Sequence, residues 1–89
     1  MTLQDALYNW LSIKKVAEQR TDDQAAADTL RFFDEILRED HGVEHIAVCI
    51  IDGSYEVDYK IGDSQHHKKF PCDYIDALWE SIEAEPKYN

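Results

Sequence analysis

The sequence predicts an α+β fold in which two N-terminal helices precede a three-stranded antiparallel sheet and a C-terminal helix, with the helices packed on one face of the sheet. Three observations predict this order. Apolar residues recur at helical spacing over the first forty residues. The turn signal Asp52-Gly53 then separates two runs of alternating apolar and polar residues. A second helical pattern follows Pro71.

The first helix is predicted to begin after Thr2, which forms a weak capping box with Asp5. Its apolar face would hold Leu3, Ala6, Leu7, Trp10, Leu11, Ile13 and Ala17. A second capping box, Thr21 with Gln24, favours a break near Arg20, although one bent helix remains an alternative.

The second helix is predicted to end at Gly42. Its apolar face would hold Ala25, Ala26, Thr29, Leu30, Phe32, Phe33, Ile36 and Leu37. Asp40 falls within this apolar arc, but it lies in the last turn, from which its side chain could reach solvent. Arg31–Glu35 and Asp34–Arg38 have the spacing of ion pairs on the polar face.

A two-residue turn at Asp52-Gly53 fixes the register of a β-hairpin. One face would pair Ile50 with Tyr55, Val48 with Val57 and Ile46 with Tyr59. The other face would pair Cys49 with Glu56, Ala47 with Asp58 and His45 with Lys60. The first set is apolar and predicts the core side, and the second set predicts an open, polar side.

A further turn at 62–64 precedes a short third strand over 66–70. With Phe70 beside Val57, Lys69 would lie opposite Asp58 and His67 opposite Lys60. Pro71 would begin the last helix and Pro86 would end it. Its apolar face would hold Ile75, Leu78, Trp79 and Ile82, with Asp76, Glu80 and Glu83 outside.

The composition of the chain predicts a single domain and limits the kinds of partner that it could bind. The 89 residues are 44% hydrophobic, which predicts a single small domain, residues 1–89, with its own core. The chain has 9 basic and 19 acidic residues and a formal net charge of −10, which repels nucleic-acid phosphates and anionic lipid. We therefore expect no nucleic-acid or membrane partner, and a protein partner of basic character is favoured.

The predicted location is the cytoplasm. The first ten residues, MTLQDALYNW, contain no basic region and so do not resemble a signal peptide. No apolar run approaches the roughly 20 residues of a membrane span. Cys49 and Cys72 lack CxxC spacing and are predicted to be free thiols in a reducing compartment.

The candidate binding site is the open face of the hairpin, formed by His45, Cys49, Glu56, Asp58 and Lys60. The carboxylates give no isolated pair for acid–base catalysis, and we expect no catalytic residue, metal or cofactor. The prediction is therefore a non-enzymatic interaction or regulatory protein, with exposed Tyr8, Tyr74 and Tyr88 as further contact residues. Self-association as a homodimer is an alternative that would add buried area to a small domain.

A second alternative is a metal- or thiol-dependent activity, because zinc takes nitrogen and sulfur ligands. The candidate ligands or reactive groups are His45, Cys49, His66, His67 and Cys72. Their spacing matches no zinc motif. A helix N-terminus would lower the pKa of the Cys72 thiol, whereas neighbouring Asp73 would oppose that effect.

The order of a hairpin, a short strand and the motif FPCDYID opening a final helix resembles the YkuJ-like small proteins of Firmicutes. The resemblance covers residues 46–84, with Pro71, Asp73, Ile75 and Asp76 as its motif-like positions. It implies a helix, three-strand, helix core and a cytosolic setting, and it implies no established activity.

Overall fold

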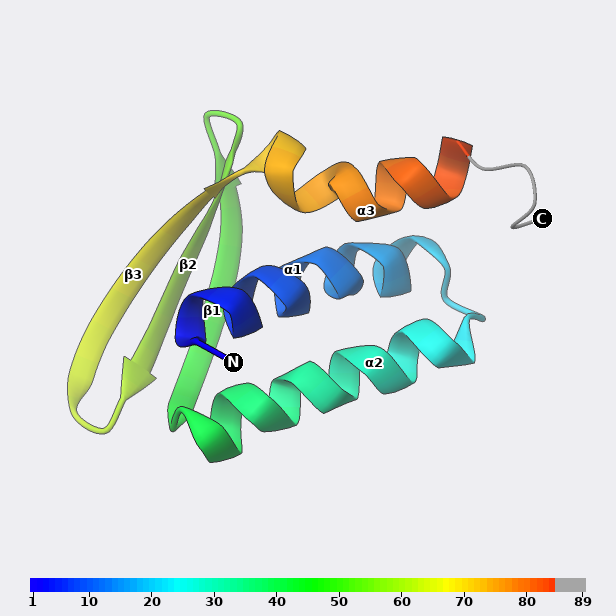
Figure 1. Cartoon of the computed structure of the whole chain (residues 1–89). Helices are drawn as coiled ribbons and strands as arrows, with labels where there is room; N and C mark the ends of the chain where they lie inside the picture. Colours follow the sequence, from blue (N-terminus) through cyan, green and yellow to red (C-terminus); the bar gives the residue numbers. More distant parts are fainter. Residues whose placement is uncertain (85–89) are drawn as a thin grey trace.

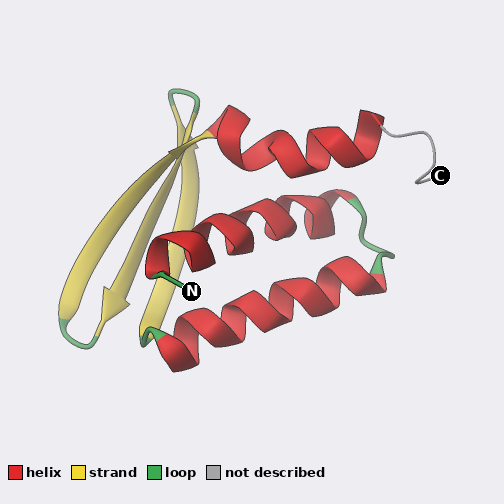
Figure 2. Cartoon of the chain, viewed as in Figure 1, coloured by secondary structure: helices red, strands yellow, loops and turns green. Residues whose placement is uncertain are grey.

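Helices cover one face of a three-stranded antiparallel sheet in the computed structural model, which describes residues 1–84 (Figure 1). The helices are α1 (Leu3–Gln19), α2 (Gln24–Glu35), its π-helical continuation η1 (Ile36–Asp40) and α3 (Cys72–Ala84). The strands are β1 (Val43–Ile51), β2 (Ser54–Ile61) and β3 (Ser64–Pro71), with β2 in the centre (Figure 2). The predicted α+β fold class is confirmed.

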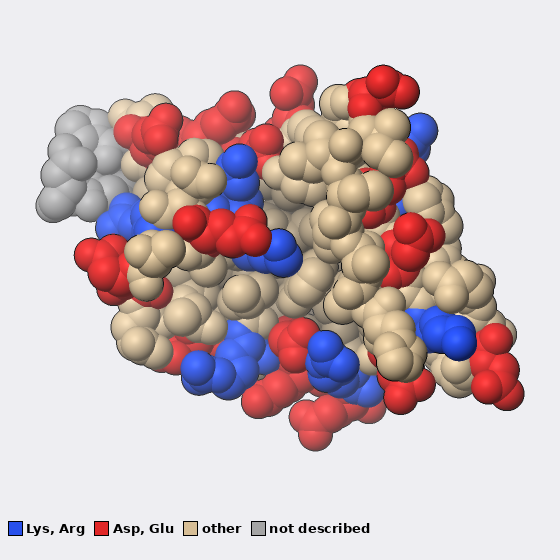
Figure 3. Space-filling view, turned by 180° about the vertical axis from the view of Figure 1, so that it is seen from behind, with Lys and Arg blue, Asp and Glu red and all other residues tan. Residues whose placement is uncertain are grey.

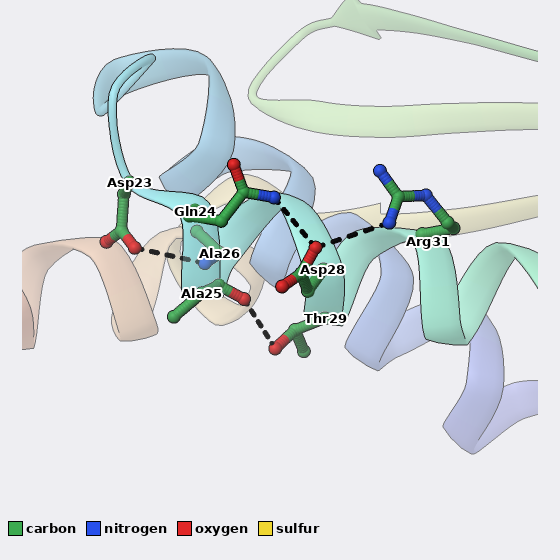
Figure 4. Close-up of polar contacts among 7 residues, drawn as sticks. All are labelled: Asp23, Gln24, Ala25, Ala26, Asp28, Thr29 and Arg31. Atoms are coloured by element: carbon green, nitrogen blue, oxygen red, sulfur yellow. Dashed lines mark hydrogen bonds and ion pairs between the residues drawn. The ribbon is translucent and has the colours of Figure 1, made fainter.

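The N-terminal region forms two separate helices, so the predicted break is confirmed. The hydroxyl of Thr2 accepts a hydrogen bond from the Asp5 N–H at 3.1 Å, as the first capping box predicts. The second cap was placed wrongly at Thr21. Asp23 caps α2 instead, because its carboxylate accepts from the Ala26 N–H at 3.1 Å (Figure 4). A charged cap also interacts favourably with the positive end of the helix dipole.

The polar face of α2 carries ion pairs, and one differs from the prediction. Arg38 Nε lies 2.9 Å from Asp34 Oδ2, so this pair forms as predicted. Arg31 contacts Asp28 at 3.2 Å rather than Glu35 (Figure 4). Asp28 also accepts from the Gln24 side chain at 2.8 Å. This side of the helix is therefore a solvated, internally paired surface.

The end of the second helix widens into η1 before the chain turns at Gly42, whose φ of +68° suits glycine. The wider turn changes which residues face the sheet. Leu37 is buried, whereas Asp40, which straight helical spacing assigned to the apolar arc, is exposed. Asp40 is therefore a surface carboxylate.

The hairpin turn has the predicted geometry. Asp52 and Gly53 both have positive φ, at +50° and +75°, as a type I′ turn requires. The register from Ile51 opposite Ser54 to Ala47 opposite Asp58 is as predicted. Tyr55, Val57 and Tyr59 are all buried beneath the helices.

A β-bulge interrupts this register near the start of β1, so the predicted pairing of His45 with Lys60 is wrong. Glu44 lies opposite Lys60, and His45 with Ile46 stands opposite Tyr59 alone. His45 has a φ of +52°. The extra residue allows Val43, which is 2% exposed, to join the core on the same face as Ile46. The cause is visible in the spacing of Val43 and Ile46, which a regular strand places on opposite faces.

The third strand is longer than predicted and its register was wrong by two residues. The turn contains two residues, Gly62 and Asp63, so that β3 runs from Ser64 to Pro71. Phe70 lies opposite Tyr55, Lys69 opposite Glu56 and His67 opposite Asp58. A shift of two residues preserves the faces, and Phe70 is buried as predicted.

The main core lies where α1, η1 and α3 meet the sheet. It contains Leu7, Trp10, Leu11, Leu37, Val43, Tyr55, Val57, Tyr59, Phe70 and Ile75. The far ends of the helices extend beyond the strands and pack on one another, with α1 between α2 and α3 (Figure 1). Val16 and Ala26 are buried there, outside the main core.

Several predicted core positions are exposed because three strands are too few to cover every apolar helix face. Phe32 on α2 and Leu78 on α3 are exposed, as are Ala25 and Thr29. Ser12 and Val16 are buried although the predicted helix face omitted them, because α1 is enclosed by neighbours on several sides. Pro86 lies outside the described residues.

Candidate interaction surface

The open face of the sheet carries the residues that alternate with the core positions. The helices lie on the opposite side, and none of those within residues 1–84 covers this face (Figure 1). Its rows across β1, β2 and β3 are Cys49–Glu56–Lys69 and Ala47–Asp58–His67. Glu56 and Asp58 are thus placed as predicted, and the third strand adds His67 and Lys69.

His67 is held between two carboxylates of the neighbouring strand. Its Nε2 lies 2.6 Å from Glu56 Oε1, and its Nδ1 lies 2.8 Å from Asp58 Oδ1. Both ring nitrogens donate only in the protonated imidazole. Hydrogen bonds to Asp58 and then to Glu56 raise the pKa of His67, and burial acts in the opposite direction. This arrangement favours the protonated form of the His67 ring between the two carboxylates.

Lys69 extends this network, and we call Glu56, Asp58, His67 and Lys69 together the charged row. The Nζ of Lys69 lies 3.5 Å from Glu56 Oε2, so that Glu56 lies between Lys69 and His67. Glu56 is half-buried, whereas Asp58 and His67 are exposed. Sequence reasoning placed His67 opposite Lys60 because it began the third strand at residue 66, two residues after its actual start at Ser64, and it therefore missed this network. A two-residue Gly62-Asp63 turn, another hairpin pattern, was the signal that could have found it.

The rest of the open face is less polar. Cys49 and Ile51 of β1 are both exposed, and Ile51 lies opposite Ser54 beside the hairpin turn. His45 is exposed at the bulge and has no single partner in β2. Lys60 is half-buried and lies between Glu44 and Gln65. The five predicted residues therefore do not form one cluster, because the bulge moves His45 out of its predicted position opposite Lys60.

The histidines and cysteines of the metal or thiol alternative are dispersed. His67 belongs to the charged row, whereas His66 stacks on Tyr59 with 5.3 Å between ring centroids. Cys72 packs against the core at the start of α3. Within residues 1–84, no group of three or more His, Cys, Asp or Glu side chains is placed to hold a metal ion.

The surroundings of Cys72 disfavour the thiolate form of its side chain. Burial raises the pKa of its thiol, and the charges of Asp76 and Asp73 raise it further, against a smaller lowering by Lys15. Its backbone N–H donates to the Gly53 carbonyl at 2.9 Å. That hydrogen bond ties the first residue of α3 to the hairpin turn, which is a structural role for this position.

Two further contacts of α3 were not found from the sequence. The hydroxyl of Tyr55 donates to Asp76 Oδ1 at 2.6 Å, although Asp76 was expected on the solvent-facing side of the last helix. The rings of Tyr8 and Tyr74 lie 4.5 Å apart, centroid to centroid. Tyr74 is exposed and Tyr8 half-buried, while Tyr88 lies outside the described residues. The Tyr8–Tyr74 pair is thus a packing contact between α1 and α3.

Acidic and basic side chains are interspersed on the surfaces of α1, α2 and η1. Figure 3 shows them mixed along the lower margin of the molecule, below the larger uncharged area. The helices carry the ion pairs Lys14–Glu18, Arg20–Asp23, Arg31–Asp28 and Arg38–Asp34. Four carboxylates of α1, α2 and the loop between them are therefore paired locally, whereas α3 carries Asp73, Asp76, Glu80 and Glu83 without a basic residue. The sheet face is the surface on which acidic and basic side chains of different strands meet.

No helix among the described residues has both the length and the apolar character needed to cross a membrane.

No protein-family model matches the chain, and no curated protein or solved structure is significantly similar to it. The resemblance to the YkuJ-like proteins accordingly stays a prediction.

Proposed function

We propose that this protein is a non-enzymatic module that binds a partner protein through the open face of its sheet. The observation that carries the proposal is a set of paired polar side chains on an uncovered sheet face, where His67 lies between Glu56 and Asp58. This set is held in place by contacts within the protein itself, so little side-chain order is lost on binding.

The chemistry of this face favours a partner with basic groups. Asp58 is exposed and contacts one nitrogen of His67, which leaves oxygen lone pairs for a further donor. The chain's net charge of −10 attracts a basic surface at long range and raises the association rate. Exposed Ile51 and Cys49 supply apolar area beside the charged row.

The test is affinity capture from the protein's own cell extract at low and high salt, followed by mass spectrometry. The wild-type protein is compared with a double charge reversal, Glu56→Lys with Asp58→Lys. A matched control, Glu35→Lys with Glu39→Lys, makes the same change in net charge at exposed helix positions. Circular dichroism verifies that each variant is folded.

We expect a basic protein that is retained at low salt, released at high salt, lost with the sheet variant and kept with the helix variant. Equal loss with both variants would show that only net charge matters and would remove the sheet face from the proposal. Capture of no protein at either salt would contradict the binding function itself.

A further inference from the structure

The two edges of the sheet differ in how they are protected from further strand pairing. The β3 edge carries Lys68 and Lys69 and ends at Pro71, which lacks an N–H; charges and proline are the usual devices that block an edge. The β1 edge carries no charge and no proline from Ile46 to Ile51. Ile50 and Ile51 there are 61% and 50% exposed.

From this contrast we propose that β1 is a docking edge, which pairs with an extended segment of the partner protein that is apolar in its centre and basic at its ends. The inference rests on the proposed binding function and names the chemistry of the partner. It adds a surface that the charged row does not include, namely the free backbone of β1.

Within residues 1–84, backbone N–H and C=O groups of β1 are left without a partner at defined positions. Ile51 and Ser54 flank a two-residue turn, so they form a hydrogen-bonded pair. Hydrogen-bonded and non-bonded pairs then alternate, which directs the N–H and C=O groups of Cys49 and Ala47 toward β2. The N–H and C=O groups of Val48 and Ile50 consequently point outward from the edge, in the plane of the sheet. They are therefore free to form hydrogen bonds with an added strand.

The side chains along this edge set the composition of the added strand. Val48 and Ile50 lie on the helix side, and Ala47, Cys49 and Ile51 lie on the open side. Every one of these five side chains is uncharged. Apolar or small side chains on the added strand would therefore make favourable cross-strand pairs at the centre.

Acidic residues mark the two ends of the uncharged segment. Glu44 precedes it and Asp52 follows it, and both are exposed. A basic residue at each end of the added strand would meet one of these carboxylates in either strand direction. A second copy of this chain fits less well, since antiparallel pairing centred on Val48 brings Glu44 of each copy opposite Asp52 of the other.

The experiment uses the full chain, labelled with ¹⁵N, and two synthetic peptides. Both have a centre of alternating valine and threonine; one has lysines at both ends and the other has glutamates. Binding is followed by chemical-shift titration, and backbone amide exchange is measured with and without the lysine peptide. The amides of Ala47 and Cys49 are internal references, because they already bond to β2.

We expect the lysine peptide to bind at least about tenfold more tightly than the glutamate peptide and to slow exchange at Val48 and Ile50. The variant Ile50→Lys should weaken this binding by about tenfold, because it removes an exposed apolar contact and adds a like charge. Leu78→Lys, an equivalent change at an exposed position of α3, should leave binding unchanged.

Three results would overturn the inference. Binding of neither peptide would do so, as would shifts confined to Glu56, Asp58 and His67 with no added protection of Val48 and Ile50. The latter result would leave the proposed function intact. The third is self-association of the protein alone, measured by sedimentation equilibrium and abolished by Ile50→Lys, which would identify a second copy as the occupant.

Discussion

The hydroxyl of Tyr55, in the central strand, donates a 2.6 Å hydrogen bond to the carboxylate of Asp76 in α3. Tyr55 is buried and Asp76 half-buried, so the bond joins the sheet to the C-terminal helix within the protein. Burial first, and then the contact with Asp76, raises the pKa of the Tyr55 hydroxyl well above its ordinary value.

Replacing Tyr55 with phenylalanine should therefore destabilise the protein. The ring still fills the core, but Asp76 loses its donor, which costs about 1.5–3 kcal/mol for a bond to a charged group. Urea unfolding followed by circular dichroism measures the change. Tyr74→Phe is the control, because the Tyr74 side chain is 54% exposed. Equal stability of Tyr55→Phe and the wild type would contradict a stabilising role for the bond.

The contacts of His67 predict a pH-dependent contribution to stability. Its pKa is raised in the folded protein, so the contribution is fully present below the ordinary pKa of about 6.5 and is lost as the pH rises through the folded value. NMR titration of the His67 ring should give a pKa above 6.5, and the double variant Glu56→Gln with Asp58→Asn should lower it. An unchanged titration in that variant would show that the two carboxylates do not hold the ring.

The bulge at His45 predicts an unusual response to substitution. A φ of +52° costs little for glycine and much more for a β-branched side chain. His45→Gly should leave stability unchanged or raise it, and His45→Val should lower it by about 1–3 kcal/mol. Thermal unfolding compares the two with Gln65→Val, at an exposed position in β3 where valine is compatible with the strand. Equal effects of valine at both positions would argue against the bulge.

Ser12 is 3% exposed and its hydroxyl has no hydrogen-bond partner among the described residues. A buried unpaired hydroxyl costs about 1–3 kcal/mol, so Ser12→Ala should be neutral or stabilising. Leu11→Ala, at the neighbouring core position, should instead cost about 2–5 kcal/mol. Chemical denaturation measures both. A clear loss of stability in Ser12→Ala would reveal a hydrogen bond of that hydroxyl.

The two thiols should differ in reactivity. Cys49 is exposed, whereas Cys72 packs against the core and burial raises its pKa, which lowers the thiolate fraction at neutral pH. We expect a disulfide reagent to label Cys49 rapidly and Cys72 slowly in the folded protein, and both rapidly in denaturant. The single variants Cys49→Ser and Cys72→Ser assign the two phases. Rapid labelling of Cys72 in the folded protein would contradict this expectation and would support a thiol-dependent activity at Cys72.

Local sequence was sufficient to predict the α+β class, the first helix cap and the hairpin register next to Asp52-Gly53. Each of these depends on interactions between residues close together in the chain. A cap joins residues three apart, and a type I′ turn fixes the pairs on either side of it. The even spacing of Ile46 and Val48 likewise assigned the core face without knowledge of the helices, although Ile50 on the same face is 61% exposed.

Tertiary structure decided the remaining features, because they depend on residues that are distant in sequence or on the shape of the whole core. The bulge forms because burying Val43 together with Ile46 requires one extra residue in β1. The charged row depends on how β3 pairs with β2. Asp76 became an internal acceptor, and Phe32 stayed exposed, because only the packed arrangement determines which helix surface the three strands can cover.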